Sequence, residues 1–327
     1  YILLYIITDS GPNDKLDLYS PKTHIIITGG SSGIGLATAI KLRKQSCSVS
    51  IIARNKTKLN NAEIEINSKC INTKGRLDVY SGDVSNQHEI QDIIQKACSV
   101  HNNHVDVLIT SAGISRPGYC EDIPIAIYQD MININYLGSL YSALAVIPYM
   151  KNNKSGRIIF VSSLAGLCGM IGFAGYSASK YAVRGLAHGL QMELKPYNIY
   201  CSLVNPPDVD TPMLAEDKLY IPEETALLSQ DGGLFNAEDV AGDIMNTLSE
   251  WKFMVNTGLD GYLLGLVSMD MTTPSHSIGR SLLEIITGSV MRMVALIYLT
   301  MWNATCSQVY SKKQKENKEN GQKLGQA

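Results

Sequence analysis

The sequence lacks features by which several classes of protein are recognised. Lys and Arg number 28 against 30 Asp and Glu, giving a formal net charge of -2, so no basic surface for nucleic acid is expected. The 7 cysteines are scattered and never spaced Cys-x-x-Cys, which favours reduced thiols over disulfides or a zinc site. No His-Glu-x-x-His pattern accompanies His101 and His104, which we place in a solvated turn. We therefore predict no metal site and no nucleic-acid partner.

A long apolar run is also missing at the start of the chain. Residues 1–7 are apolar, but a membrane-spanning helix needs roughly 20 such residues. We expect residues 1–21 to hold either the end of a hydrophobic anchor or a short buried strand.

What the sequence does contain is an alternation of strand and helix patterns. β-branched runs predict six buried strands, at residues 24–28, 48–53, 77–80, 105–110, 157–161 and 199–204. Helices are expected at residues 36–44, 58–68, 86–100, 125–150, 176–195 and 237–250. This order predicts a single-domain, doubly wound parallel sheet of the Rossmann type.

A glycine-rich turn joins the first predicted strand to the first helix. Small residues there would let the backbone approach a pyrophosphate, which the helix N-terminus would stabilise. The candidate cofactor contacts are Gly29, Ser31, Ser32, Gly33, Ile34 and Gly35. The spacing Gly-x-x-x-Gly-x-Gly differs from the usual dinucleotide fingerprint, and a turn without a ligand is the alternative.

The end of the second predicted strand has no acidic residue that could bind the ribose hydroxyls of NAD. Arg54 follows that strand instead, and its planar guanidinium suits the 2′-phosphate of NADPH. Lys58 is a second, weaker candidate. Asp83 and Val84 follow the third strand, where an adenine edge is expected, although Asp83 could equally cap the next helix. The sequence favours NADPH, with a solvated loop as the alternative for Arg54.

A hydroxyl, a phenol and an amine occur within one short span. Tyr176 and Lys180 lie four residues apart on a predicted helix, so their side chains share a face. We expect the ammonium of Lys180 to lower the pKa of the Tyr176 phenol and make it a better proton donor. Ser163 would then hold a substrate carbonyl oxygen beside that phenol.

The remainder of the chain changes character. Residues 208–233 are expected to form a loop that covers the substrate. Residues 256–310 are hydrophobic, with an apolar stretch at 278–302 interrupted by charged residues, among them Glu284 and Arg292. A membrane segment or a dimerisation helix would explain them. The lysine-rich tail, residues 311–327, is expected to be disordered.

Together these motifs resemble the short-chain dehydrogenase/reductase family over residues 22–250. The resemblance implies an NADP(H)-binding catalytic domain, which we place at residues 22–255. It implies that Tyr176 donates the proton, Lys180 tunes Tyr176 and binds the nicotinamide ribose, and Ser163 stabilises the carbonyl oxygen. It also implies that Asn135 holds a relay water and that Thr211 lies near the nicotinamide.

The sequence departs from the family pattern after two strands. The family's Asn-Asn-Ala-Gly reads Thr-Ser-Ala-Gly at residues 110–113, which leaves a usual amide interaction without its residue. The family's Pro-Gly reads Pro206-Pro207.

Four segments, residues 134–139, 191–198, 206–212 and 260–262, resemble a branch of that family that reduces long-chain sphingoid ketones. This resemblance implies NADPH-dependent reduction of a 3-keto group at the endoplasmic reticulum membrane, with the catalytic domain facing the cytosol and a homo-oligomer possible. Lid carboxylates, among them Asp208, Asp210 and Glu216, could attract the substrate amine or could simply be solvated. Alternative functions are a membrane-associated reductase of steroids or retinoids and a non-catalytic NADP(H)-binding scaffold.

Overall fold

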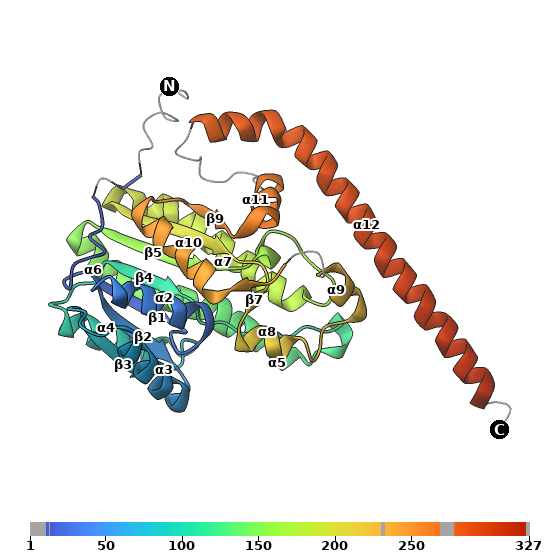
Figure 1. Cartoon of the computed structure of the whole chain (residues 1–327), viewed down its shortest axis with the longest axis horizontal. Coiled ribbons are helices and arrows are strands. Elements are labelled where there is room, and N and C mark those ends of the chain that lie inside the picture. The colour runs from blue at the N-terminus through green and yellow to red at the C-terminus, as the bar shows by residue number, and fades with distance from the viewer. Residues whose placement is uncertain (1–10, 13, 230–232, 269–277, 325–327) are drawn as a thin grey trace.

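The computed structural model describes residues 11–12, 14–229, 233–268 and 278–324. Its centre is a parallel sheet of seven strands in the order β3-β2-β1-β4-β5-β6-β9 (Figure 1). The strands are β1 (His24–Thr28), β2 (Ser48–Ala53), β3 (Leu77–Ser81), β4 (Val107–Thr110), β5 (Gly156–Val161), β6 (Ile199–Asn205) and β9 (Met254–Asn256). The order reverses between β1 and β4, which is where open sheets of this type bind ligands.

Helices cover both faces of the sheet. One face packs on α4 (Gln87–Val100), α6 (Gly138–Asn153) and α7 (Ala174–Leu194). The other packs on α2 (Gly33–Lys44), α3 (Lys56–Lys69) and α10 (Ala237–Ser249). The central strands β1, β4 and β5 are buried along their whole length, as expected for β-branched runs between two helical layers. The predicted doubly wound α/β fold is thus confirmed.

One helix differs from the prediction. The expected helix at 125–150 is α5 (Ile125–Met131) and α6, joined by the π-helical turn η2 (Ile132–Leu137). Such turns insert one residue into a helix and often occur at functional sites. Short 3₁₀ turns occur at η1 (Cys120–Asp122), η3 (Leu164–Gly166) and η4 (Lys195–Tyr197).

The segment predicted as a covering loop has secondary structure of its own. It contains β7 (Val209–Asp210), α8 (Pro212–Asp217) and α9 (Glu223–Leu228), and β7 pairs with β8 (Phe235–Asn236). Pro212 begins α8 because its fixed φ suits the first turn of a helix, and Thr211 accepts a capping hydrogen bond from the Leu214 N–H at 3.3 Å. Residues 230–232 lie outside the described part.

The C-terminal region forms two helices, α11 (Gly258–Val267) and α12 (Ile278–Leu324). α12 runs along one side of the body and past it (Figure 1). The prediction of a disordered tail is wrong for residues 311–324, which continue this helix. Lys312 pairs with Glu223 at 2.9 Å, and Lys313 pairs with Glu224 at 3.2 Å. Among the described residues, none of the helices combines the length and hydropathy required to cross a bilayer.

The N-terminal segment is only partly described. Residues 1–10, for which an anchor or a buried strand is expected, lie outside the described part. Beyond them, Asp14 pairs with Arg157 of β5 at 3.0 Å, and the Tyr200 hydroxyl donates to the Gly11 carbonyl at 2.8 Å. The described residues 11–12 and 14–21 therefore pack on the α/β body.

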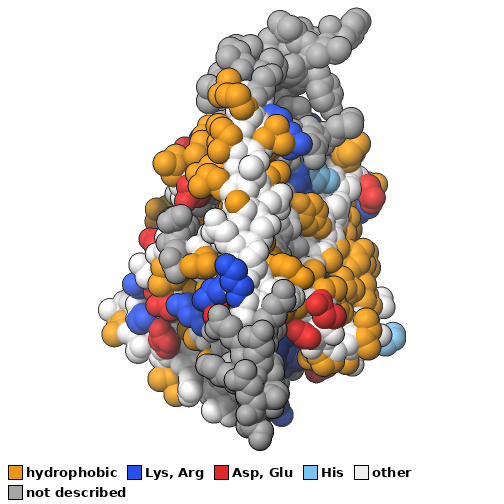
Figure 2. All heavy atoms as spheres, turned by 90° about the vertical axis from the view of Figure 1, so that its right-hand side faces the viewer, with side chains coloured by type: hydrophobic (Ala, Val, Ile, Leu, Met, Phe, Trp, Pro, Cys, Tyr) orange, Lys and Arg blue, Asp and Glu red, His pale blue; other side chains and the backbone are white. Residues whose placement is uncertain are grey.

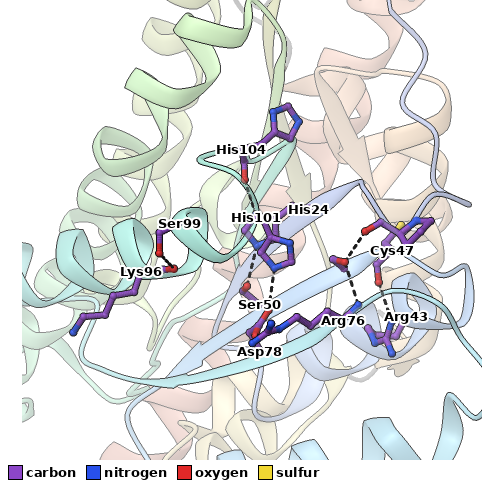
Figure 3. A network of polar contacts seen from close by, with 12 residues as sticks. His24, Arg43, Cys47, Ser50, Arg76, Asp78, Lys96, Ser99, His101 and His104 are labelled. Atoms are coloured by element: carbon purple, nitrogen blue, oxygen red, sulfur yellow. Dashed lines mark hydrogen bonds and ion pairs between the residues drawn. The ribbon is translucent and has the colours of Figure 1, made fainter.

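A polar cluster lies at the amino ends of the strands, away from the candidate site (Figure 3). His24 stacks on His101 with ring centroids 3.8 Å apart, and its Nε2 lies 2.9 Å from the Ser50 hydroxyl. Nε2 of His101 lies 2.9 Å from Asp78 Oδ2, and the His101 side chain is only 11% exposed. The prediction that His101 lies in a solvated turn is therefore wrong, because its ring stacks on His24 and is largely buried at the amino ends of the strands.

Candidate active site

The loops after β1, β4 and β5 surround one cavity of about 1370 Å³. It is lined by twelve of the predicted site residues, namely Gly29, Ser31, Ser32, Gly33, Ile34, Arg54, Lys58, Val84, Ser163, Tyr176, Lys180 and Thr211. Gly35, Asp83 and Asn135 do not line it. Residues more than 180 positions apart in the chain thus meet at the carboxyl edge of the sheet.

Two glycines of the glycine-rich turn have no room for a side chain. Gly29 has a φ of +72°, and a Cβ there would lie 2.6 Å from the backbone nitrogen of Ala112. Gly35 packs against the Gly29 carbonyl, so its role is to bring α2 close to β1.

The same turn fits the pyrophosphate of a dinucleotide. The Ser32 side chain makes no capping hydrogen bond, and α2 has no acidic residue in its first turn. Its N–H groups therefore remain available to an anion at the cavity. Thr211 packs against this turn, since a Cβ on Gly33 would lie 3.0 Å from Thr211 Cγ2.

Arg54 lies at the cavity rim, and its side chain is 54% exposed. Its guanidinium lies 3.5 Å from Asp83 Oδ2. The prediction that Asp83 could cap α4 is wrong, because Asn86 caps that helix through the Glu89 N–H. Asp83 instead accepts hydrogen bonds from the backbone and the hydroxyl of Ser85, at 2.9 and 2.7 Å.

Ser163, Tyr176 and Lys180 converge from β5 and α7. Ser163 lies just after β5 and caps η3, because its hydroxyl accepts a hydrogen bond from the Ala165 N–H at 3.1 Å. Lys180 is 5% exposed, donates to the Val161 carbonyl at 3.0 Å, and places Nζ 5.6 Å from the centre of the Tyr176 ring. The helix spacing of four residues thus brings the amine beside the phenol, as the pattern predicts.

The electrostatics of this trio differ from the expectation. Burial lowers the pKa of Lys180 to about 8. Burial raises the pKa of Tyr176, and the charges of Asp217 and Asp208 raise it further, whereas Ser163 opposes them through a hydrogen bond. The predicted lowering of the Tyr176 pKa is wrong for the protein alone, because desolvation of the buried phenol is the largest effect on this group and raises its pKa.

Asn135 lies behind the cavity wall in the π-helical turn and is 1% exposed. Its amide exchanges two hydrogen bonds with the backbone of Ile114, at 2.8 and 2.9 Å, and donates to the Ser179 hydroxyl at 2.9 Å. It therefore joins the loop after β4 to α7. A Cβ on Gly113 would lie 3.2 Å from Asn135 Oδ1 and 3.7 Å from Lys180 Nζ, so the amide and the amine flank the same backbone.

The cavity residues that were not predicted from the sequence include Ser115, Arg116 and Asp217. Asp217 is the last residue of α8 and is 6% exposed. Nothing in its local sequence distinguishes it from the other lid carboxylates, because its burial depends on how the lid folds. Arg116 follows β4 and places its guanidinium 3.3 Å from the centre of the Tyr220 ring.

Comparison with characterised proteins agrees with this geometry. The family model for short chain dehydrogenases matches residues 23–219. A 3-ketodihydrosphingosine reductase from Mus musculus is 40% identical over 298 residues, which cover 91% of this chain and 89% of the relative. A 3-dehydrosphinganine reductase from Danio rerio is 38% identical over 304 residues, with the same coverage of 91% and 89%.

Solved structures share the fold. The crystal structure of levodione reductase has a TM-score of 0.66 at 22% identity and covers 72% of this chain and 95% of its own. The structure of ElxO with NADP bound has a TM-score of 0.63 at 25% identity and covers 71% of this chain and 96% of its own. The chain therefore belongs to the short-chain dehydrogenase family and is an oxidoreductase that uses a nicotinamide cofactor.

Proposed function

We propose that the protein reduces the 3-keto group of 3-ketodihydrosphingosine with NADPH, a step of sphingolipid synthesis. The observation that carries this proposal is the convergence of Ser163, Tyr176 and Lys180 with the glycine-rich turn in one cavity. The curated relatives named above, which are called reductases of this ketone, support the choice of substrate.

The roles of the site residues follow from their positions. The Ser163 hydroxyl and the Tyr176 phenol would hold the ketone oxygen, where negative charge develops during reduction. The cofactor, when bound, supplies the hydride that the carbonyl carbon accepts. The Tyr176 O–H bond then breaks and its proton passes to the substrate oxygen, giving the alcohol.

The pKa shifts are consistent with this proton transfer. Because the pKa of Tyr176 is raised, the phenol keeps its proton until the developing alkoxide attracts it. Lys180, with a pKa of about 8, is mostly protonated at neutral pH and stabilises the phenolate that remains. Asn135 holds the loop after β4 against α7, which fixes the positions of these groups relative to one another.

The preference for NADPH rests on Arg54. No acidic side chain follows β2, and the exposed Arg54 guanidinium at the cavity rim can bind a 2′-phosphate bidentately. Lys58, which also lines the cavity, would add a second positive charge.

We further propose that α12 rests on the cytosolic face of the endoplasmic reticulum membrane. Val290, Met293 and Ile297 are 54–58% exposed and recur at helical spacing along one face. Another face of α12, including Tyr298 and Trp302, lines the cavity. Figure 2 shows hydrophobic side chains gathered on both sides of this helix. A helix placed in this way would bring the cavity to a lipid surface in which the alkyl chain of the substrate is concentrated.

Substrate identity is tested by supplying purified protein with NADPH and either 3-ketodihydrosphingosine or a panel of steroid and retinoid ketones. We expect efficient formation of dihydrosphingosine, identified by mass spectrometry, and little turnover of the panel. Preferential reduction of a steroid or retinoid would overturn the substrate assignment. No turnover of any ketone would instead favour a binding scaffold.

A further inference from the structure

The wall of the cavity beside Tyr176 contains a buried carboxylate that the mechanism above does not use. Asp217 lies at the end of α8, lines the cavity and is 6% exposed. Within the described residues, no cation forms an ion pair with it. Its neighbour Arg116 acts only through its charge, since the guanidinium lies over the Tyr220 ring.

A second polar group faces the same place. The Ser115 hydroxyl approaches Asp217, yet Ser115 Oγ is buried with no partner in hydrogen-bond geometry among the described residues. Buried polar groups of folded proteins are nearly always satisfied. A buried carboxylate that has no cation partner among the described residues, beside a hydroxyl with no partner in hydrogen-bond geometry, therefore indicates a ligand with complementary polar groups.

The charge of Asp217 agrees with a cationic ligand. Burial raises the pKa of Asp217 to about 6, and the like charges of Glu216 and Asp208 act in the same direction, whereas the Ser115 hydroxyl and the charge of Arg116 oppose them. An ammonium group placed beside it would supply the missing positive charge and lower this pKa again. Asp208 also lines the cavity and would contribute a second, more exposed carboxylate.

The location is defined by Tyr176. Ser115, which approaches Asp217, lies two residues after Gly113, where an added Cβ would be 3.7 Å from Lys180 Nζ. Asp217 therefore lies near the Tyr176–Lys180 pair, in agreement with the rise that its charge causes in the pKa of the Tyr176 phenol. In a 3-keto sphingoid base the carbon that bears the ammonium is bonded directly to the ketone carbon, and a hydroxyl follows on the next carbon. A ketone held at Tyr176 thus brings its ammonium to the same region of the cavity.

We propose that Asp217 is the specificity-determining residue that binds the substrate ammonium, with the Ser115 hydroxyl facing the terminal hydroxyl of the substrate. This inference rests on the proposed function. It assigns Asp217 to ground-state binding and orientation of an aminoketone, and not to the hydride or proton transfer itself.

The test compares two ketones on three proteins. The ketones are 3-ketodihydrosphingosine and the same chain without the amine, and the proteins are the unmodified enzyme, Asp217→Asn and Asp210→Asn. Asp210 is the matched control, because it is an exposed lid carboxylate that does not line the cavity.

We expect Asp217→Asn to lower kcat/KM for the aminoketone about 10- to 100-fold, mainly through KM, because a charge-assisted hydrogen bond is lost. Its kcat/KM for the ketone without the amine should stay within about twofold of the unmodified enzyme, which also shows that the variant folds. Asp210→Asn should change neither value by more than about twofold.

Equal losses on both ketones, or no loss on the aminoketone, would overturn the ammonium site while leaving the proposed function intact. An unmodified enzyme that reduces only the ketone without the amine would overturn both.

Discussion

Replacing Arg54 by Ala should change the cofactor preference of the enzyme. A hydrogen bond to a charged group contributes about 1.5–3 kcal/mol. The Arg54 side chain is 54% exposed, so solvent screening places the loss near the lower limit, about 1.5 kcal/mol. We therefore expect the KM for NADPH to rise about tenfold and the KM for NADH to change little.

Asp83 adds to this effect. Burial raises the pKa of Asp83, but the hydrogen bonds from Ser85 and the charge of Arg54 outweigh burial and keep this pKa below its usual value. The Asp83 carboxylate is therefore charged at neutral pH. Without Arg54 that carboxylate would repel a 2′-phosphate. The Arg54–Asp83 pair is itself exposed, so its loss should cost less than about 1 kcal/mol of stability.

The assay follows oxidation of NADPH and of NADH at saturating ketone in the unmodified enzyme, Arg54→Ala and Lys56→Ala. Lys56 is a matched control, because it is an exposed cation near Arg54 that does not line the cavity. Equal increases in the KM for both cofactors, or the same NADPH effect in Lys56→Ala, would refute the 2′-phosphate assignment.

Two further predictions concern stability and the C-terminal helix. Burial and the neighbouring His101 lower the pKa of His24 from 6.5 to about 4, although His104, Asp106 and Asp78 act in the opposite direction. The folding stability that depends on neutral His24 is therefore fully present above pH 6.5 and is lost as the pH falls toward 4. Between pH 7.5 and 5, urea titrations should show that the free energy of unfolding falls by about 2 kcal/mol, and His24→Asn should lack this fall. An equal fall in His24→Asn would show that His24 is not the group responsible. Lys313→Glu should break the ion pair with Glu224, release α12 and speed the hydrogen exchange of its amides. Adding Glu224→Lys to the same chain should restore the pair and the protection. Unchanged exchange in Lys313→Glu would show that this ion pair does not hold α12.

Local sequence patterns predicted the sheet well, because each central strand is buried on both faces and therefore reads as an uninterrupted β-branched run. The edge strand β9 was missed because its three residues, Met254–Asn256, are too few to form a pattern. The lysine-rich end of α12 has a polar sequence, and only its ion pairs with α9 show why it is ordered there.

Some features of the candidate site could likewise be predicted from local sequence, and others could not. The glycine-rich turn and the Tyr176–Lys180 spacing are local, so the sequence was sufficient to place them together. The raised pKa of Tyr176, the burial of His101 and the burial of the Asp217 carboxylate depend on which groups the fold removes from water. No local pattern encodes that removal.

The most direct test of the proposed chemistry is single-turnover reduction of 3-ketodihydrosphingosine by Tyr176→Phe, with NADPH binding measured on the same sample. Removing the phenol oxygen removes the proton donor, so the rate should fall by about 10²- to 10⁴-fold while NADPH affinity stays within about threefold. A variant that binds NADPH and still reduces the ketone at the rate of the unmodified enzyme would contradict the assignment of Tyr176 as the acid.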